Sequence, residues 1–266
     1  MSNLKRDAAV WAARIRECRN PLLWLSAIDY DRQRMEIFNG VLQSELGKTA
    51  NYLREIEDDA PFIADVRDRL ARWTAYKPRA IDFMMSGRSG SVFFNEVTLY
   101  AIVRVIQPDV VIETGGTPGK STAFILRAME RNNKGHLYTI DLPPQNTNQR
   151  MLTEHGTWHQ ALPQGLSSGW VVPEVLRDRN TLYSGKSSEH LPALLAKLDK
   201  IDIFLHDSDH SYENMVWEFE TAWPAIKPGG IVLSDDVLAN SSFFDFCRRK
   251  KSRARHVFNL GATRRS

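Results

Sequence analysis

Acidic side chains follow two apolar segments in the C-terminal half of the chain, in a pattern that suits a bound cation. DSDH (207–210) comes directly after IDIFLH, and DD (235–236) comes after GGIVLS. If the two segments are neighbouring strands, three or four carboxylates meet at one edge, which is costly unless a cation or a proton lies among them. Oxygen ligands without cysteine favour Mg²⁺, with Mn²⁺ or Ca²⁺ as alternatives. A structural role stays open, with Asp209 as a helix N-cap and Asp236 as a loop residue.

A glycine-rich segment, ETGGTPGKST (113–122), is the second candidate site. Glycines between an apolar run and a helical pattern let the backbone approach a ligand closely. A phosphate-binding P-loop, G-x-x-x-x-G-K-[ST], needs its first glycine where Thr114 stands, and a G-x-G-x-x-G dinucleotide motif does not fit. The pattern that fits is E-x-G-x-x-x-G, formed by Glu113, Gly115 and Gly119. A tight turn without a ligand is the alternative.

Apolar periodicity predicts the elements that position these residues. The expected strands are DVVIETG (109–115), HLYTIDL (136–142), NTLYSG (180–185), IDIFLHD (201–207), GGIVLSDD (229–236) and a terminal RHVFNLG (255–261). Helical patterns lie between most of them, and this alternation predicts an α/β fold with a mostly parallel sheet. Ligand sites in such sheets lie at the carboxyl ends of the strands, where both candidate sites fall.

The first ~85 residues show helical patterns and no strand pattern. Apolar stripes with helical spacing occur at residues 8–18, 35–46 and 63–73. YKPRAIDFMMSGRSGS (76–91) carries one proline and two glycines and is expected to be a linker. We therefore expect an N-terminal helical extension, residues 1–85, that covers the site or builds an oligomer, followed by a ligand-binding domain, residues 86–266.

The glycine segment resembles the first motif of class I S-adenosylmethionine-dependent methyltransferases, which packs against the methionine part of the cofactor. In that family an acid at the end of the next strand binds both ribose hydroxyls, and Asp141 stands at that position. A carboxylate accepts two such hydrogen bonds without a proton of its own. YSGKSSEHLPALL resembles the family's segment beside the adenine, with Ser187 in place. The resemblance implies a Rossmann-like, mostly parallel sheet flanked by helices and a cofactor site of Glu113, Gly115, Gly119, Asp141, Ser187 and Asp207.

The acidic block resembles the metal-dependent O-methyltransferases of the catechol and caffeoyl-coenzyme-A type. Those enzymes place an Asp after the fourth strand, Asp-Asn after the fifth, and a lysine base three residues after the first Asp. Here His210 takes the base position and Asp236 replaces the Asn, which resembles a bacterial branch that methylates sugars of natural products. The resemblance covers roughly residues 90–240. It implies Asp207, Asp235 and Asp236 as ligands of Mg²⁺ or Mn²⁺, and His210 as general base.

The chemistry of methyl transfer agrees with this assignment. A neutral hydroxyl is a poor nucleophile, and Mg²⁺ on its oxygen together with a nearby imidazole makes it a better one. An unperturbed histidine pKa near ~6.5 suits such a base. A second hydroxyl next to the first would let the acceptor chelate the cation, so we expect a vicinal diol in the acceptor. His206 is the rival base, but strand alternation points it to the other side of the sheet from Asp207.

We therefore expect an S-adenosylmethionine-dependent, Mg-dependent O-methyltransferase that acts on a hydroxyl of a sugar, a glycosylated product or another small natural product. One alternative is a P-loop-like phosphotransferase that binds a nucleotide through Lys120 and Ser121, which leaves Asp141 without a role. The other is a metallohydrolase that uses the cluster from Asp207 to His210, for which only His256 follows as a further histidine.

The composition of the chain indicates which kinds of partner it does not have. The chain has 266 residues and two cysteines, and no uncharged apolar run approaches the ~20 residues of a membrane helix. Charged residues near its start predict no signal peptide, so we expect a cytoplasmic protein without a membrane partner. Eight basic residues and no acid follow Cys247. We interpret this basic end as a solvated helix face and tail, with no nucleic-acid partner, because Phe258 is its sole interleaved aromatic. A homo-oligomer would form through the N-terminal helices.

Overall fold

The computed structural model of this chain describes residues 21–43, 46–71, 94–142, 151–152, 158–159 and 165–266. The helical stripe expected at 8–18 and the linker expected at 76–91 lie outside the described residues. The division expected between residues 85 and 86 also lies outside them and stays a prediction. None of the described helices has both the length and the apolar character that a membrane crossing requires.

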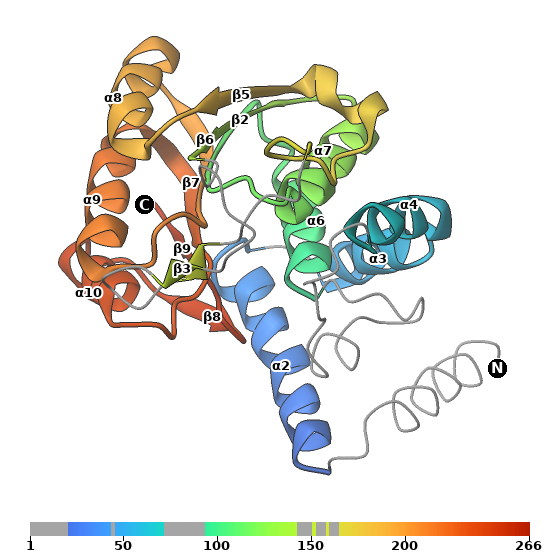
Figure 1. Cartoon of the computed structure of the whole chain (residues 1–266). Helices are drawn as coiled ribbons and strands as arrows, with labels where there is room; N and C mark the ends of the chain where they lie inside the picture. Colours follow the sequence, from blue (N-terminus) through green and yellow to red (C-terminus); the bar gives the residue numbers. More distant parts are fainter. Residues whose placement is uncertain (1–20, 44–45, 72–93, 143–150, 153–157, 160–164) are drawn as a thin grey trace, which may run out of the picture.

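A seven-stranded sheet lies at the centre of the chain (Figure 1). In chain order its strands are β1 (Val110–Thr114), β2 (His136–Asp141), β5 (Asn180–Ser184), β6 (Ile201–His206), β7 (Ile226–Ser234), β8 (Arg255–Val257) and β9 (Leu260–Arg264). Their spatial order is β5-β2-β1-β6-β7-β9-β8. In this order the first five strands, β5, β2, β1, β6 and β7, pair in parallel with their neighbours, whereas β9 is antiparallel to both β7 and β8. The predicted mostly parallel Rossmann-like sheet is thus confirmed.

Helices cover both faces of this sheet. They are α2 (Pro21–Gly40), α3 (Leu46–Glu57), α4 (Ala60–Ala71), α6 (Phe94–Ile106), α7 (Lys120–Asn132), α8 (Ser187–Leu198), α9 (Tyr212–Ala222) and α10 (Ser242–Arg249). Two 3-10 helices, η2 (Glu174–Arg179) and η3 (Trp223–Ala225), precede β5 and β7, and β3 (Met151–Leu152) pairs with β4 (Trp158–His159) in a separate antiparallel ribbon.

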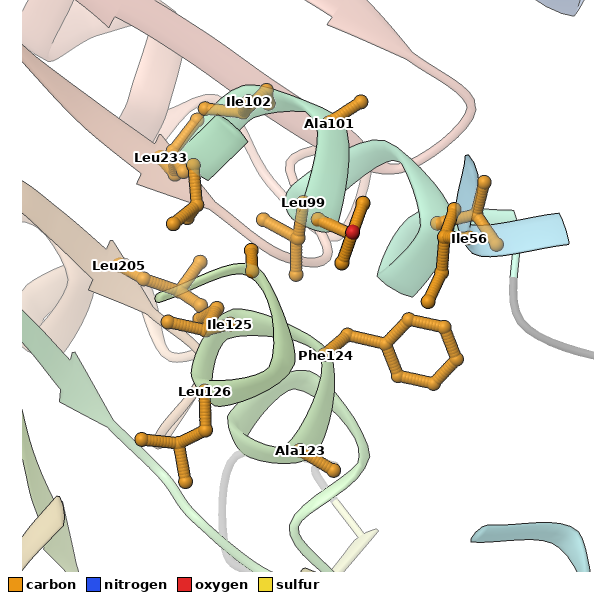
Figure 2. Close-up of a cluster of buried hydrophobic side chains, with 14 of the residues drawn as sticks. Ile56, Leu99, Ala101, Ile102, Ala123, Phe124, Ile125, Leu126, Leu205 and Leu233 are labelled. Carbon is orange, nitrogen blue, oxygen red and sulfur yellow. The ribbon is translucent and has the colours of Figure 1, made fainter. Parts of the chain in front are cut away.

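Alternation of side chains along the strands divides the core into two hydrophobic clusters. Leu205 and Leu233 of the sheet pack with α6 and α7 in the first cluster, part of which Figure 2 shows. Phe204, the neighbour of Leu205 on β6, packs with α8, α9 and α10 in the second cluster. The sheet is therefore covered on both faces, as expected for the continuous apolar runs of its parallel strands.

Helix α3 packs on α6 and helix α4 contacts α7 through Phe62 and Phe124, whereas α2 packs against β8. Ile56 of α3 belongs to the same hydrophobic cluster as Phe124 of α7, and both are labelled in Figure 2. Arg104 of α6 pairs with Glu55 of α3, with 2.8 Å between Nε and Oε1. Helices α3 and α6 therefore share one core and one ion pair, so this part of the helical extension is held against the sheet domain.

The C-terminal segment differs from its predicted single strand. Strands β8 and β9 form a hairpin whose turn includes Phe258 in the left-handed region, at a φ of 50°. Arg265, predicted to lie in a solvated tail, donates from Nη1 to the carbonyl oxygens of Trp223 and Pro224, at 2.8 and 2.9 Å. Arg248, in contrast, is largely exposed on α10. Part of the basic end therefore stabilises the fold, because a guanidinium has enough donors to bind several carbonyl groups.

Candidate active site

The carboxyl ends of the parallel strands open into a cavity of about 750 Å³. This volume is within the ~300–1,000 Å³ of small-molecule sites. The strand order reverses between β1 and β6, and ligands of α/β sheets bind at such a reversal. All predicted site residues but one line the cavity, namely Gly115, Gly119, Asp141, Ser187, Asp207, His210, Asp235 and Asp236. The exception is Glu113.

Close packing of the backbone explains the glycines after β1. Gly115 has a φ of 86°, and a Cβ placed on it would lie 1.9 Å from the carbonyl oxygen of Asp207. Gly119 has a φ of 104°, and a Cβ there would lie 2.8 Å from the Cα atom of Gly169. Both positions therefore require glycine. The loop is held against the end of β6 on one side and leads directly into α7, whose first residue, Lys120, lines the cavity.

Glu113 lies beneath the loop and does not reach the cavity. Its fully buried carboxylate accepts hydrogen bonds from Ser121 Oγ at 2.5 Å, Thr122 Oγ1 at 2.6 Å and Thr139 Oγ1 at 3.2 Å. Burial nevertheless raises the pKa of Glu113 to about 7. Glu113 therefore ties β1 to α7 and β2, and any effect on a ligand in the cavity is exerted through the loop.

The raised pKa of Glu113 predicts a pH-dependent stability. An exposed Glu titrates near ~4.3, so the folded chain binds this proton more tightly than the unfolded chain. The stabilisation by the bound proton is complete below about pH 4 and is lost as the pH rises to about 7. We expect Glu113→Gln to reduce the fall in the free energy of unfolding between pH 5 and pH 8, measured by urea denaturation. Glu174→Gln, at an exposed position, is the control; an unchanged pH dependence in Glu113→Gln would contradict the assignment.

Asp141 ends β2 at the edge of the cavity, where the ribose contact was predicted. Its Oδ1 accepts from the backbone N–H of Gly116 at 2.9 Å, and its Oδ2 accepts from Thr117 Oγ1 at 2.6 Å and also from Ser168 Oγ. These hydroxyls are donors of the same kind as the ribose hydroxyls that the prediction assigns to Asp141. Ser187 begins α8 and lines the same cavity. Sequence reasoning missed Ser168, since nothing local marks it as a partner of β2.

The two acidic segments meet as their positions after β6 and β7 predicted. These strands are parallel neighbours with His206 opposite Ser234, so the residues that follow, Asp207 and Asp235, leave the sheet side by side. One ligand atom each of Asp207, His210 and Asp235 lies within 4.8 Å of the other two. We call these three residues the acidic group. The two carboxylates are oxygen ligands of the kind that Mg²⁺ and Mn²⁺ prefer, so their donor chemistry fits the predicted metal without His210 as a ligand.

Asp236 lies next to the acidic group but not within it. Its Oδ2 is 3.8 Å from Nδ1 of His210, and its Oδ1 accepts a hydrogen bond of 2.5 Å from Asn259 Nδ2. Its φ of 48° is in the left-handed region, which residues other than glycine rarely adopt and which is concentrated at functional sites. The three aspartates predicted as ligands thus do not gather around one point, because this backbone turn directs Asp236 toward His210 and Asn259.

The electrostatics of the acidic group favour a positive charge within it. Loss of contact with water and the charge of Asp235 raise the pKa of Asp207. Burial and the charge of Asp236 raise the pKa of Asp235 to about 7. A cation among these carboxylates would relieve both effects. For His210, burial and the neighbouring His206 lower the pKa to about 4. The expectation of an unperturbed value near 6.5 is therefore wrong, because the ring lies away from water and beside a second imidazole.

A buried pair beneath the acidic group was not foreseen. His206 Nδ1 lies 2.6 Å from Glu218 Oε2 of α9, and both side chains are fully buried. The His206 ring faces α9, as alternation along β6 predicts, and packs edge-on against His210 with 5.2 Å between ring centroids. A signal was present in the sequence, since Glu218 is an acid within the apolar stripe that Met215 and Phe219 form on α9.

Comparison with known proteins identifies the class. Residues 112–237 match the family described as methyltransferase domain. Among solved structures, the chain resembles the methyltransferase PaMTH1 of Podospora anserina, solved with SAH bound, with a TM-score of 0.52 and 13% identity over 84% of this chain and 97% of that chain. It also resembles a protein of Klebsiella pneumoniae assigned as an O-methyltransferase, with a TM-score of 0.51 and 16% identity over 77% of this chain and 90% of that chain. No curated protein matches the sequence.

These findings agree with the cavity at the strand ends and with the loop that follows β1. The predicted Rossmann-like fold is confirmed, and the predicted enzyme class is confirmed as a methyltransferase, because residues 112–237 carry a methyltransferase domain.

Proposed function

We propose that this enzyme transfers a methyl group from S-adenosylmethionine to one hydroxyl of a vicinal diol, with Mg²⁺ or Mn²⁺ as metal cofactor. The observation that supports it best is that the acidic group and the loop after β1 line one cavity. The cavity volume leaves room for a small acceptor beside the cofactor.

The cofactor is assigned to the side of the cavity formed by β1, β2 and α8. S-adenosylmethionine supplies the methyl group on a sulfonium centre when it is bound. Gly115 and Gly119 hold the loop that faces its methionine part. Asp141, whose carboxylate also accepts from Gly116 and Thr117, is assigned to the ribose hydroxyls. Ser187 is placed at the adenine side. Glu113 contributes from below by fixing the loop.

The metal is assigned to Asp207 and Asp235 of the acidic group. Asp236, the third ligand that the sequence predicted, stays a candidate next to this group, and its carboxylate faces His210 and Asn259. Oxygen ligands favour Mg²⁺, and a divalent cation lowers the pKa of a hydroxyl that binds to it. The raised pKa values of Asp207 and Asp235 support this assignment, since each carboxylate is held close to other negative charges. Asp207 also contacts the loop, because its carbonyl oxygen lies against Gly115. We therefore assign it to both the cofactor side and the metal side of the cavity.

His210 is proposed as the general base that accepts the proton of the acceptor hydroxyl. Its Nε2 is buried and has no hydrogen-bond partner among the described residues, so this nitrogen can accept a proton. With its pKa lowered to about 4, the ring is neutral at pH 7, which is the form that a base requires. The edge-on contact with His206, itself held by Glu218, fixes the position of the ring.

A sugar or a glycosylated natural product is the proposed acceptor, by resemblance to enzymes with the same Asp-x-x-His pattern. Polar side chains of the cavity, among them Asn95, Ser208 and Asn214, can bind further hydroxyls. The P-loop-like alternative is not favoured, because Lys120 pairs with Glu96 at 2.8 Å. The metallohydrolase alternative is not favoured either, because His256 lies on β8 and bonds the Phe258 carbonyl. A cytoplasmic location stays part of the proposal.

Removal of the metal is the direct test of this function. We expect the purified enzyme with Mg²⁺ to methylate diol probes, 3,4-dihydroxybenzoate and methyl α-L-rhamnoside, and to leave the monohydroxy analogue 4-hydroxybenzoate unmodified, as measured by mass spectrometry. Excess EDTA should abolish the transfer, and added Mg²⁺ should restore it. Transfer that persists in EDTA would contradict the metal role, and equal transfer to 4-hydroxybenzoate would contradict the diol.

A further inference from the structure

A charged pair forms part of the cavity wall and belongs neither to the acidic group nor to the predicted cofactor motif. Lys120, the first residue of α7, and Glu96, in the first turn of α6, lie with 2.8 Å between Nζ and Oε1. Both residues line the cavity. The Glu96 side chain is 10% exposed and that of Lys120 is 29% exposed, so both charges are largely withdrawn from water.

Lys120 is linked both to the loop that faces the proposed cofactor and to the acidic group. Lys120 follows Gly119 directly, so its backbone belongs to the loop that faces the proposed cofactor. Its positive charge also acts on the acidic group, because it lowers the pKa of Asp207 and Asp235. The α7 amino end carries no side-chain cap, and the partial positive charge of a helix start favours an anion there.

We propose that Lys120 and Glu96 bind the amino-acid group of S-adenosylmethionine, with Lys120 on its carboxylate and Glu96 on its ammonium. This inference rests on the proposed cofactor site. The amino-acid group is a zwitterion whose two charges are separated by one carbon atom, and a close pair of opposite protein charges is complementary to it. Binding replaces one ion pair within the protein by two between protein and ligand, in a place that is already shielded from water.

The test compares two ligands that differ only in the amino-acid group. S-adenosylhomocysteine carries it, whereas 5′-methylthioadenosine has the same adenosine and sulfur without it. In isothermal titration without metal, we expect Lys120→Met to bind S-adenosylhomocysteine about tenfold more weakly than the wild type, the usual effect of one charge-assisted hydrogen bond. Binding of 5′-methylthioadenosine should be unchanged. Glu96→Gln should show the same selectivity.

Two controls separate this effect from a general one. Lys134→Met removes a lysine that pairs with Asp109 away from the cavity, and it should leave both affinities unchanged. Asp141→Ala removes the proposed ribose contact, which both ligands share, and it should weaken both. If the wild type binds neither ligand, the proposed cofactor site is wrong and this inference falls with it.

The double variant Lys120→Met/Glu96→Gln distinguishes ligand binding from a structural role. If the pair only supports the fold, Lys120→Met acts by leaving Glu96 buried and unpaired, and the double variant should regain the affinity for S-adenosylhomocysteine. If the pair binds the amino-acid group, the ratio of the affinity for S-adenosylhomocysteine to that for 5′-methylthioadenosine should be lower in the double variant than in either single variant. Regained affinity, or an equal loss for both ligands in Lys120→Met, would overturn the inference while leaving the cofactor site in place.

Discussion

Replacing Asp235 by asparagine is expected to remove most Mg²⁺ binding, and methyl transfer with it, while the fold is retained. Asparagine keeps the shape of the side chain but removes one of the two carboxylate charges of the acidic group. Mutation of a residue that only supports a metal ligand typically lowers the metal affinity ~10–100-fold. Because Asp235 is proposed as a ligand itself, we expect its replacement to lower the affinity for Mg²⁺ at least ~100-fold in isothermal titration. Asp209→Asn is the matched control. Asp209 lines the same cavity, but it lies outside the acidic group and accepts from the backbone N–H of Ser211.

The same Asp235→Asn substitution that weakens Mg²⁺ binding should stabilise the enzyme when no metal is present. Burial and Asp236 raise the pKa of Asp235 to about 7, so the folded state carries this charge at a cost above that pH. We expect Asp235→Asn to raise the Tm at pH 8 in EDTA by a few degrees, since 1 kcal/mol is worth ~2–4 °C in a domain of this size. Added Mg²⁺ should then stabilise the wild type but not the variant. A variant that binds Mg²⁺ as tightly as the wild type would disprove the ligand assignment.

Replacing Gly115 by alanine is expected to have the largest effect on the fold of the site. The new Cβ would lie 1.9 Å from the oxygen and 2.5 Å from the carbon of the Asp207 carbonyl group, and backbone atoms cannot turn aside as a flexible side chain can. The left-handed φ of 86° adds ~1–2 kcal/mol and the overpacking ~1–3 kcal/mol. We expect a fall in Tm of roughly 10 °C and loss of S-adenosylhomocysteine binding, because the loop and the end of β6 must separate.

Gly165→Ala is the control that isolates the backbone contribution. Gly165 also has a left-handed φ, of 79°, but a Cβ there would meet nothing within 4 Å. We expect a loss of ~1 kcal/mol and unchanged affinity for S-adenosylhomocysteine. If calorimetry shows that Gly115→Ala is no less stable than Gly165→Ala, the loop after β1 does not pack on the end of β6.

Local sequence patterns predicted the frame of the site, because each strand and helix carries its own periodic signal. The apolar run 109–115 contains β1 and the glycine turn after it, and the runs 201–207 and 229–236 contain most of β6 and β7. Since parallel strands end at the same edge, the meeting of Asp207 with Asp235 also followed from the sequence. The terminal strand failed as a prediction, because nothing in the alternation of 255–261 marks the turn at Phe258.

Contacts between distant segments could not be predicted in this way. Asn259, in the C-terminal hairpin, holds Asp236, and Asn95 of α6 donates to Asp235 over 140 residues of sequence. Lys120 was considered only as a phosphate ligand, because its pairing with Glu96 depends on how α6 and α7 pack. The low pKa of His210 likewise depends on burial and on the neighbouring His206 ring.

The sequence by itself determined the order of strands and helices, the methyltransferase class, and which residues stand at the carboxyl ends of the strands. Those features depend on side-chain periodicity and on short motifs, which are local. The tertiary structure alone decided which carboxylates share a cation site, which way Asp236 turns, and which charges His210 and Lys120 face. The physical reason is that charge interactions and loss of hydration depend on distances across the fold, and those distances are set only when the helices and the sheet have packed.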